Sequence, residues 1–158
     1  MIKYNSVVLF CKDIERSKIF YQDMFMLDIE LVIGGLVTYS CGISLWEQKD
    51  AKEQLYPGTD QISSPEYPIQ ELYFETDEIV EFSTLLIEKK IRILHPVTTT
   101  PWNQRTIRFF DPDGNLIEVG ESMDHIVRRL SKEGLSFEEI SQKTWFPIEI
   151  IKKMLGSV

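Results

Sequence analysis

The chain has 158 residues, 43% of them hydrophobic, and its 17 basic and 25 acidic residues give a net charge of -8. This length is enough for one well-buried domain and slightly more, while the charge disfavours binding to nucleic acid or anionic lipid as a whole-molecule effect. The apolar runs are too short for a secretory signal or for the roughly 20 residues of a membrane span, so we expect a soluble cytoplasmic protein that contacts no membrane.

The first half of the chain alternates strand-like and helical patterns. Residues 6–11 form an apolar, β-branched run, and Asp13 follows as the N-cap of a periodic helical segment at 14–25. Turn glycines then separate three strand candidates, at residues 27–33, 36–40 and 43–48. This order predicts a βαβββ module at about residues 4–48. We expect the polar segment that follows, residues 49–66, to be a loop.

The same order of elements then repeats. A strand at 71–76 leads through Asp77, a predicted helix cap, into a helical segment. Three strands follow, predicted at residues 91–95, 105–110 and 115–120. This duplication predicts a second module at about residues 69–121. Because one module is too small to bury both faces of its sheet, we expect the two modules to share a core or a cavity.

The last part of the chain, residues 123–158, lies outside the repeat. A helix is predicted near its start, then a second helix with Ser136 and Glu139 as a capping box, and a third with Pro147 as its first residue. This order resembles a small helix-turn-helix. The last helix carries only two nearby cations, so we expect the tail to pack on the core or on a second subunit rather than on nucleic acid.

Two segments carry a family resemblance. VVLFCKDIERSKIFYQDMFML is similar to the opening, and FFDPDGNLIEV to the closing hairpin, of the vicinal oxygen chelate superfamily. That superfamily includes glyoxalase I, bleomycin and fosfomycin resistance proteins, and extradiol dioxygenases. The resemblance implies an α+β fold of paired βαβββ modules that form a curved mixed β-sheet cavity, with this domain at residues 1–122 and a helical extension at 123–158. It also implies a homodimer, but not a particular reaction, because one scaffold hosts many chemistries.

Alternation of side chains along a strand selects the residues that face the predicted cavity. The helix-side positions are the apolar ones, and the opposite positions are mixed in character. The residues turned toward the cavity by this rule include Ser6, Phe10, Glu71, Tyr73, Arg108 and Glu118. The resemblance adds Ser44 and Trp46. The tight turn at Asp113 and Gly114 fixes the register that turns Glu118 inward.

In metal-dependent members of the superfamily, four equivalent inward positions hold a divalent cation. The resemblance places Ser6, Ser44, Glu71 and Glu118 at these positions, and of the four only Glu118 has the usual residue type. Gln70 competes with Glu71 for its position, because the register there is uncertain by one residue. Two serines are poor ligands for a transition metal. We therefore expect no cofactor, with a divalent metal held by Glu118 and Glu71 as the alternative.

The polar residues predict both an ion-pair network and a recognition patch. Arg108 offsets part of the repulsion between Glu118 and Glu71, and the trio suits a small organic ligand bounded by aromatic walls. The predicted walls are Phe10, Trp46 and Tyr73. In the loop before the seventh predicted strand, Trp102 and Arg105 are further candidates for ligand contacts, while a structural Trp covering the sheet end is the alternative.

Three functions remain open at this point. The leading hypothesis is a small-molecule-binding protein of the glyoxalase and bleomycin resistance type without the usual complete metal site. The alternative is a glyoxalase-like, metal-dependent lyase or isomerase in which Glu118 and Glu71 are catalytic, with Glu118 as metal ligand or general base. A second alternative is a ligand-responsive regulator that acts through the C-terminal helices.

Overall fold

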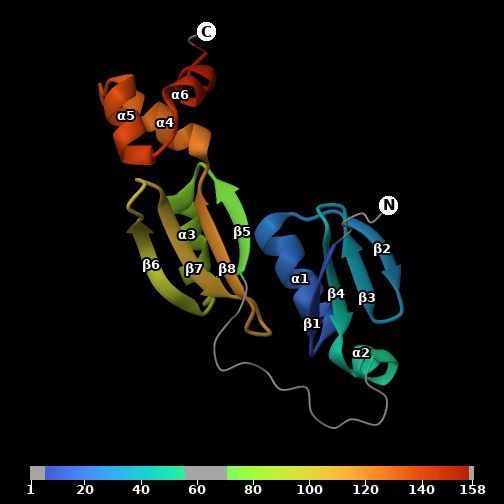
Figure 1. The fold of residues 1–158 in the computed structure, drawn as a ribbon. Coiled ribbons are helices and arrows are strands. Elements are labelled where there is room, and N and C mark those ends of the chain that lie inside the picture. Colours follow the sequence, from blue (N-terminus) through green and yellow to red (C-terminus); the bar gives the residue numbers. More distant parts are fainter. Residues whose placement is uncertain (1–5, 56–70, 157–158) are drawn as a thin grey trace, which may run out of the picture. The chain divides into compact units, whose positions relative to one another are not determined.

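The computed structural model describes residues 6–55 and 71–156, which divide into two compact units. Of the described residues, the first unit comprises 6–55 with 111–115, and the second comprises 71–110 with 116–156. Each unit contains one four-stranded mixed sheet and the helices that follow its strands (Figure 1). The α+β fold with paired βαβββ modules is therefore confirmed. In the described parts of the chain, no helix is long and apolar enough to cross a membrane.

The first unit has the predicted order of elements. These are β1 (Val7–Cys11), α1 (Ile14–Phe25), β2 (Ile29–Ile33), β3 (Leu36–Tyr39) and β4 (Ile43–Glu47). The sheet order is β1-β4-β3-β2, with β1 parallel to β4 and the other pairs antiparallel. Leu9, Val37 and Leu45 alternate onto the buried face, against α1. Asp13 caps α1 as predicted, since its side chain accepts a hydrogen bond from the amide of Arg16 at 3.0 Å.

The segment after β4 differs from the prediction. Residues 49–66 were expected to form a loop, but α2 (Gln48–Leu55) is a helix. Its sequence contains no Gly or Pro and is rich in good helix formers, and its Ala51 is buried. The rest of that predicted loop, residues 56–66, lies outside the described residues.

The two cysteines differ in burial. Cys11 is buried, and burial raises the pKa of its thiol to about 11. Cys41 is exposed. It lies in the turn between β3 and β4, where the chain leaves the sheet. An apolar neighbourhood in sequence does not bury a turn residue, because turns run over the surface.

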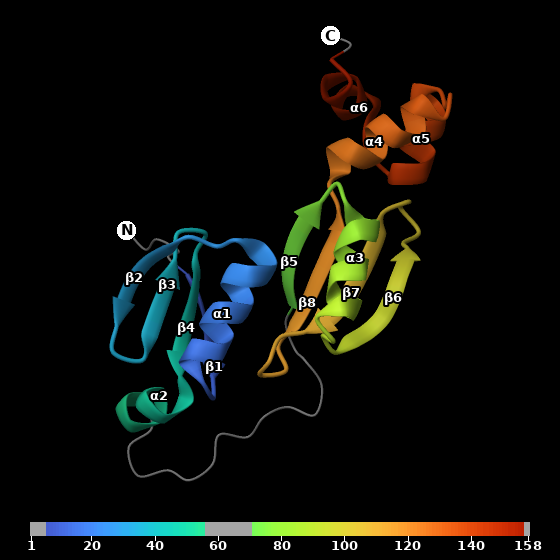
Figure 2. The same cartoon turned by 180° about the vertical axis from the view of Figure 1, so that it is seen from behind.

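The second unit repeats the topology of the first. Its elements are β5 (Glu71–Thr76), α3 (Ile79–Glu88), β6 (Ile93–Thr99), β7 (Arg105–Phe110) and β8 (Leu116–Glu121). The sheet order is β5-β8-β7-β6, with β5 parallel to β8. Ile107, Phe109, Ile117 and Val119 are buried on the face that α3 covers (Figure 2). The predicted cavity shared by the two sheets stays a prediction.

Two local predictions in this unit are wrong. Asp77 does not cap α3: the N-cap is Glu78, and the carboxylate of Asp77 instead accepts a hydrogen bond from the hydroxyl of Ser122 at 2.5 Å. The strand predicted to end at His95 continues to Thr99, and its register with β7 shifts between His95 and Thr98. This shift accommodates Pro96, which has no amide hydrogen to donate to the neighbouring strand.

The C-terminal helices belong to the second unit and lie beyond the end of β8 (Figure 1). They are α4 (Met123–Lys132), α5 (Phe137–Thr144) and α6 (Ile148–Met154). They enclose a core of their own, formed by Ile126, Val127, Leu130, Ile140 and Ile151. The capping box of Ser136 and Glu139 is confirmed, whereas Pro147 is the N-cap of α6 rather than its first residue.

The loop Asp111–Asn115 joins β7 to β8 but belongs to the first unit. Asp113 accepts hydrogen bonds from the amide of Lys12 at 3.0 Å, the guanidinium of Arg16 at 2.9 Å and the hydroxyl of Ser17 at 2.6 Å. Asp111 accepts one from the hydroxyl of Tyr21 at 3.0 Å. The two aspartates therefore bind the loop to the start and the middle of α1.

Changing Asp113→Ala should lower the free energy of unfolding by about 2 kcal/mol, because it leaves the buried hydroxyl of Ser17 and the amide of Lys12 without their acceptor. Urea unfolding followed by circular dichroism measures the change. The matched control is Glu15→Gln in α1, the helix that Asp113 contacts. Glu15 forms an exposed ion pair with Lys18, which should contribute less than about 1 kcal/mol. Equal effects of the two substitutions would contradict the structural role of Asp113.

Candidate functional site

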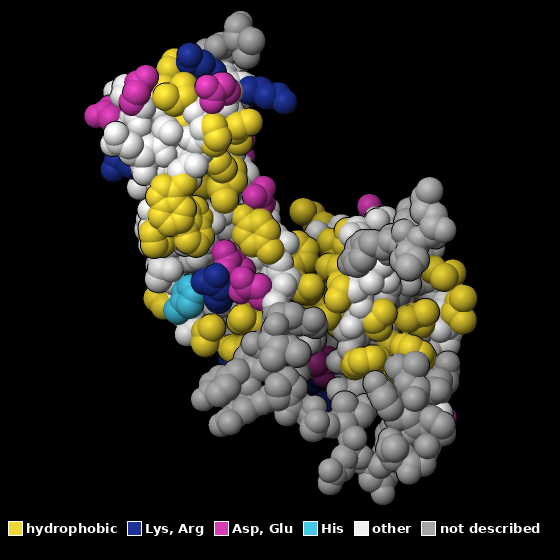
Figure 3. All heavy atoms as spheres, viewed as in Figure 1, with side chains coloured by type: hydrophobic (Ala, Val, Ile, Leu, Met, Phe, Trp, Pro, Cys, Tyr) yellow, Lys and Arg dark blue, Asp and Glu magenta, His cyan; other side chains and the backbone are white. Residues whose placement is uncertain are grey.

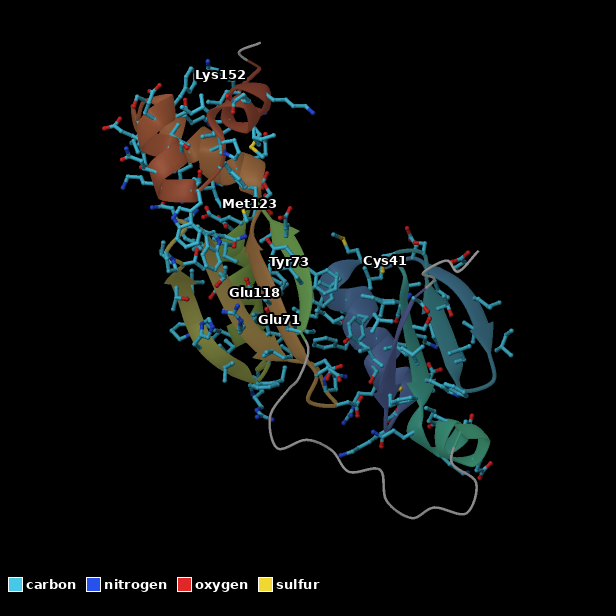
Figure 4. The ribbon with its side chains drawn as sticks, viewed as in Figure 1. Cys41, Glu71, Tyr73, Glu118, Met123 and Lys152 are labelled. Atoms are coloured by element: carbon cyan, nitrogen blue, oxygen red, sulfur yellow. The ribbon has the colours of Figure 1, made fainter. Side chains whose placement is uncertain are left out.

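The face of the second sheet opposite α3 carries polar side chains in register. Tyr73 pairs with Glu118, Glu118 with Arg108, and Arg108 with His95, so four neighbouring strands contribute to one row. Glu71 lies on the same face because it is two residues before Tyr73. We call Glu71, Tyr73, Arg108 and Glu118 the polar face. Figure 4 shows Glu71, Tyr73 and Glu118 close together on this sheet.

Arg108 is the centre of the polar face. Its Nε donates a hydrogen bond to Glu71 at 3.0 Å, and its Nη2 forms an ion pair with Glu118. Glu118 is 4% exposed, whereas the side chains of Arg108 and Glu71 are about one-third exposed. The guanidinium therefore lies between one buried and one accessible carboxylate, as the predicted ion-pair network requires.

The environment of Glu118 favours its neutral form. Burial raises the pKa of this carboxyl, the charge of Arg108 opposes that effect, and the nearby charge of Glu71 adds to it. The hydrogen bond to Glu71 in turn raises the pKa of Arg108. The carboxylate of Glu118 therefore depends on Arg108 for its charge, and losing the guanidinium would leave it buried without a cation.

Gln104 joins the polar face to a neighbouring tryptophan. Its Nε2 donates hydrogen bonds to the hydroxyl of Tyr73 at 2.7 Å and to the carbonyl of Glu121 at 2.8 Å. Its Oε1 accepts one from the indole of Trp102 at 3.0 Å. Burial raises the pKa of Tyr73 to about 12, so its hydroxyl stays protonated. Sequence reasoning missed this buried amide.

Gly120 makes room for that amide. A Cβ at position 120 would lie 2.6 Å from Nε2 of Gln104 and 3.3 Å from the hydroxyl of Tyr73. A glycine inside a strand signals a close approach of another group, so the sequence contained one clue to this arrangement.

Trp102 and Arg105 point to different parts of the unit. The ring of Trp102 lies 5.6 Å from the ring of Trp145, which follows α5. Arg105 lies on the opposite face of β7 from Arg108 and forms an ion pair with Glu121. The structure therefore brings Trp102 next to the polar face through Gln104 but holds the guanidinium of Arg105 on another carboxylate. Their predicted roles as ligand contacts stay predictions.

Glu121 is a buried anion that the sequence did not reveal. It is fully buried, accepts a hydrogen bond from the amide of Arg105 at 3.0 Å, and pairs with the side chains of Arg105 and Arg129, the latter at 3.2 Å. Burial by itself raises the pKa of Glu121, but the hydrogen bonds from Arg105 and the charge of Arg129 more than offset it, so the pKa is lowered. This carboxylate binds α4 to the sheet.

His125 also has partners, although none was evident from the sequence. Its ring nitrogens lie 3.7 Å from carboxylate oxygens of Asp77 and Glu121. His95 contacts its own neighbour, with Nδ1 at 2.8 Å from the carbonyl of Pro96. Both histidines therefore have structural contacts, and only His95 lies in the row of the polar face.

The first unit brings together the other predicted ligand contacts. Phe10 pairs with Trp46 and Val8 with Ser44 across β1 and β4, on the face opposite α1. The rings of Phe10 and Trp46 lie 6.3 Å apart. The hydroxyl of Ser44 donates a hydrogen bond to that of Ser6 at 3.3 Å. This face is aromatic with a small hydroxyl cluster.

These residues do not fit a divalent metal. Ser6 and Ser44 bond to each other, and Arg108 supplies the positive charge beside Glu118 and Glu71. In residues 6–55 and 71–156, no three or more His, Cys, Asp or Glu side chains are grouped so as to hold a metal ion. Gln70, the other residue considered for the position of Glu71, lies outside the described residues.

Changing Glu121→Gln should lower the free energy of unfolding by about 3 kcal/mol at pH 7, because Arg105 and Arg129 lose their buried counter-ion. The folded-state pKa of Glu121 is lowered, so its stabilisation is present above the usual glutamate pKa of about 4.3 and is lost as the pH falls through the folded-state value. Urea unfolding should show that the difference in the free energy of unfolding between wild type and variant is smaller at acid pH than at neutral pH.

The control for this experiment is Glu133→Gln, which removes an exposed carboxylate 3.4 Å from the same Arg129. Its effect should stay below about 1 kcal/mol at both pH values. A difference for Glu121→Gln that does not change with pH would contradict the assignment.

A family of known proteins matches most of the chain. The model of the glyoxalase-like domain family matches residues 4–124. No curated protein matches the chain.

Solved structures support the same relationship. A protein of unknown function from Agrobacterium tumefaciens str. C58 is 31% identical, with a TM-score of 0.67, over 78% of this chain and 96% of that one. A lactoylglutathione lyase from Agrobacterium tumefaciens is 24% identical, with a TM-score of 0.58, over 75% and 92% of the two chains. A glyoxalase/bleomycin resistance protein/dioxygenase family enzyme from Burkholderia phytofirmans PsJN is 18% identical, with a TM-score of 0.66, over 77% and 100%. The last two likenesses concern the fold.

Proposed function

Because the chain belongs to the glyoxalase-like domain family, we propose that it binds a small organic molecule on its polar face and does so without a divalent metal. The observation that carries this proposal is the bonding of one guanidinium, that of Arg108, to both Glu118 and Glu71. A cation that belongs to the protein already balances these carboxylates. A metal ion would have to displace it and would gain only two protein ligands in this unit, fewer than such ions usually take.

The same geometry argues against Glu118 as a general base. A base must reach its substrate with a free lone pair, whereas the buried carboxylate of Glu118 is held by Arg108. Glu71 and Tyr73 are the accessible members of the polar face. We therefore assign Glu71 and the hydroxyl of Tyr73 to ligand recognition, and Glu118 and Arg108 to holding the face in shape.

The first unit supports a parallel role. Phe10 and Trp46 give the face opposite α1 an aromatic character, and Ser6 and Ser44 add hydroxyl groups. Aromatic surface with a few placed polar groups is typical of small-molecule sites. We include this face among the ligand-binding surfaces of the protein. The homodimer expected from the resemblance is also part of the proposal, and light scattering over a range of protein concentrations tests it.

Metal analysis separates this proposal from the lyase or isomerase alternative. Freshly purified protein should contain no stoichiometric nickel, zinc, manganese or iron by inductively coupled plasma mass spectrometry, and titration calorimetry with each ion should show no site of micromolar affinity. The reason is the positive charge of Arg108 beside both carboxylates.

Glu118→Gln and the conservative Glu15→Gln serve as the pair of variants for this measurement, since Glu15 lies on the exposed surface of α1. One equivalent of metal that is present in wild type and in Glu15→Gln but lost in Glu118→Gln would overturn the proposal. It would favour the metal-dependent alternative instead.

Native mass spectrometry tests ligand binding directly. Protein purified under gentle conditions should carry an organic mass that denaturation releases, and Glu71→Gln combined with Tyr73→Leu should abolish this mass while the fold is kept. Retention of the same mass by the double variant would show that the ligand binds elsewhere.

A further inference from the structure

We propose that the C-terminal helices form part of the ligand-binding surface, with Trp145 and Trp102 as aromatic contacts for a planar, positively charged ring system. This inference rests on the proposed function, because it extends the polar face of the same unit. It concerns residues beyond the glyoxalase-like domain, which ends at residue 124, since Trp145 lies between α5 and α6.

Trp145 is an unusual residue for its position. It is the C-cap of α5 and has a φ of 63°, in the left-handed region that favours glycine. Its side chain is 65% exposed, so burial gives little in return. A large aromatic side chain that is both exposed and held in an unfavourable backbone conformation is better explained by binding than by stability.

A chain of direct contacts leads from Trp145 to the polar face. Trp145 lies against Trp102, and the indole of Trp102 donates to Gln104. Gln104 is 2% exposed and donates to the hydroxyl of Tyr73. Each member is fixed by a ring contact or a hydrogen bond, so an unbroken series of contacts joins the tryptophan pair to the polar face. Figure 3 shows hydrophobic side chains gathered where this sheet meets the helices, next to a cluster of acidic and basic side chains.

The charges beside the tryptophans select the class of ligand. Glu71 and Glu118 share one guanidinium, that of Arg108, and a third carboxylate, Glu75, accepts a hydrogen bond from Tyr73 at 3.0 Å. The excess of carboxylates attracts a cation, while the two indole rings offer flat faces for stacking. A fused ring system with a charged amine offers both the flat face and the positive charge that these groups would recognise.

Proflavine, a fluorescent planar aromatic cation, is a suitable probe, and fluorescence anisotropy of the full-length protein measures its binding. Trp145→Gly removes the ring and also relieves the left-handed backbone, so this variant should fold as well as wild type or better. It should bind proflavine about tenfold more weakly, the usual scale for losing one stacked ring. Trp145→Asn, which also tolerates this backbone conformation, is the second variant.

The matched control is Met26→Gly. Met26 is likewise the C-cap of a helix, with a φ of 50°, and is 86% exposed, but it lies in the first unit. This variant should bind proflavine as wild type does. Anthracene-2-carboxylate, a planar anion, should bind wild type at least about tenfold more weakly than proflavine, because the acidic excess repels it.

The outcomes separate the two proposals. Unchanged binding in a folded Trp145→Gly or Trp145→Asn variant, together with weaker binding in Tyr73→Leu, would overturn the part given to the helices and leave the polar face in place. Binding that is insensitive to all of these changes would overturn both proposals. Wild-type protein that does not bind proflavine, or that binds the anion equally well, would overturn the proposed class of ligand.

Discussion

The contact between Arg108 and two glutamates is the interaction on which the account of this protein depends. A buried carboxylate such as Glu118 is costly unless a cation accompanies it, and the guanidinium supplies that cation from the neighbouring strand. Its Nε also reaches Glu71 on β5, so one side chain of β7 contacts the neighbouring strand and the strand beyond it. Glu71 and Glu118 thus share a counter-charge, Arg108, that comes from the same sheet.

A second buried anion connects the family domain to its extension. Glu121 ends β8 and pairs with Arg105 of the sheet and Arg129 of α4. Gln104 donates hydrogen bonds both to the hydroxyl of Tyr73 and to the carbonyl of Glu121. Glu121 therefore contacts the residue that orients Tyr73 and also holds α4 through its side chain. The C-terminal helices are thus joined to the sheet by polar contacts, whereas their own core is apolar. A substitution that moves the backbone of Glu121 would therefore also move Gln104 and, through it, the hydroxyl of Tyr73.

Much of the fold follows from the sequence, because alternation and turn residues are local signals. The order of strands and helices and the capping of α1 by Asp13 were both predicted in this way. Contacts between residues distant in sequence were not. Asp77 resembles a helix cap in its local sequence, yet it bonds to Ser122, and Arg105 resembles a ligand contact until Glu121 is seen beside it. No periodicity reveals which charged residue will meet which partner.

Crystals of the full-length protein grown with manganese or nickel, with anomalous difference maps recorded at the metal edge, test the central claim most directly. The account predicts that Arg108 stays bonded to Glu118 and Glu71 and that no anomalous peak lies within bonding distance of either carboxylate. A peak coordinated by both glutamates, with the guanidinium displaced, would contradict it.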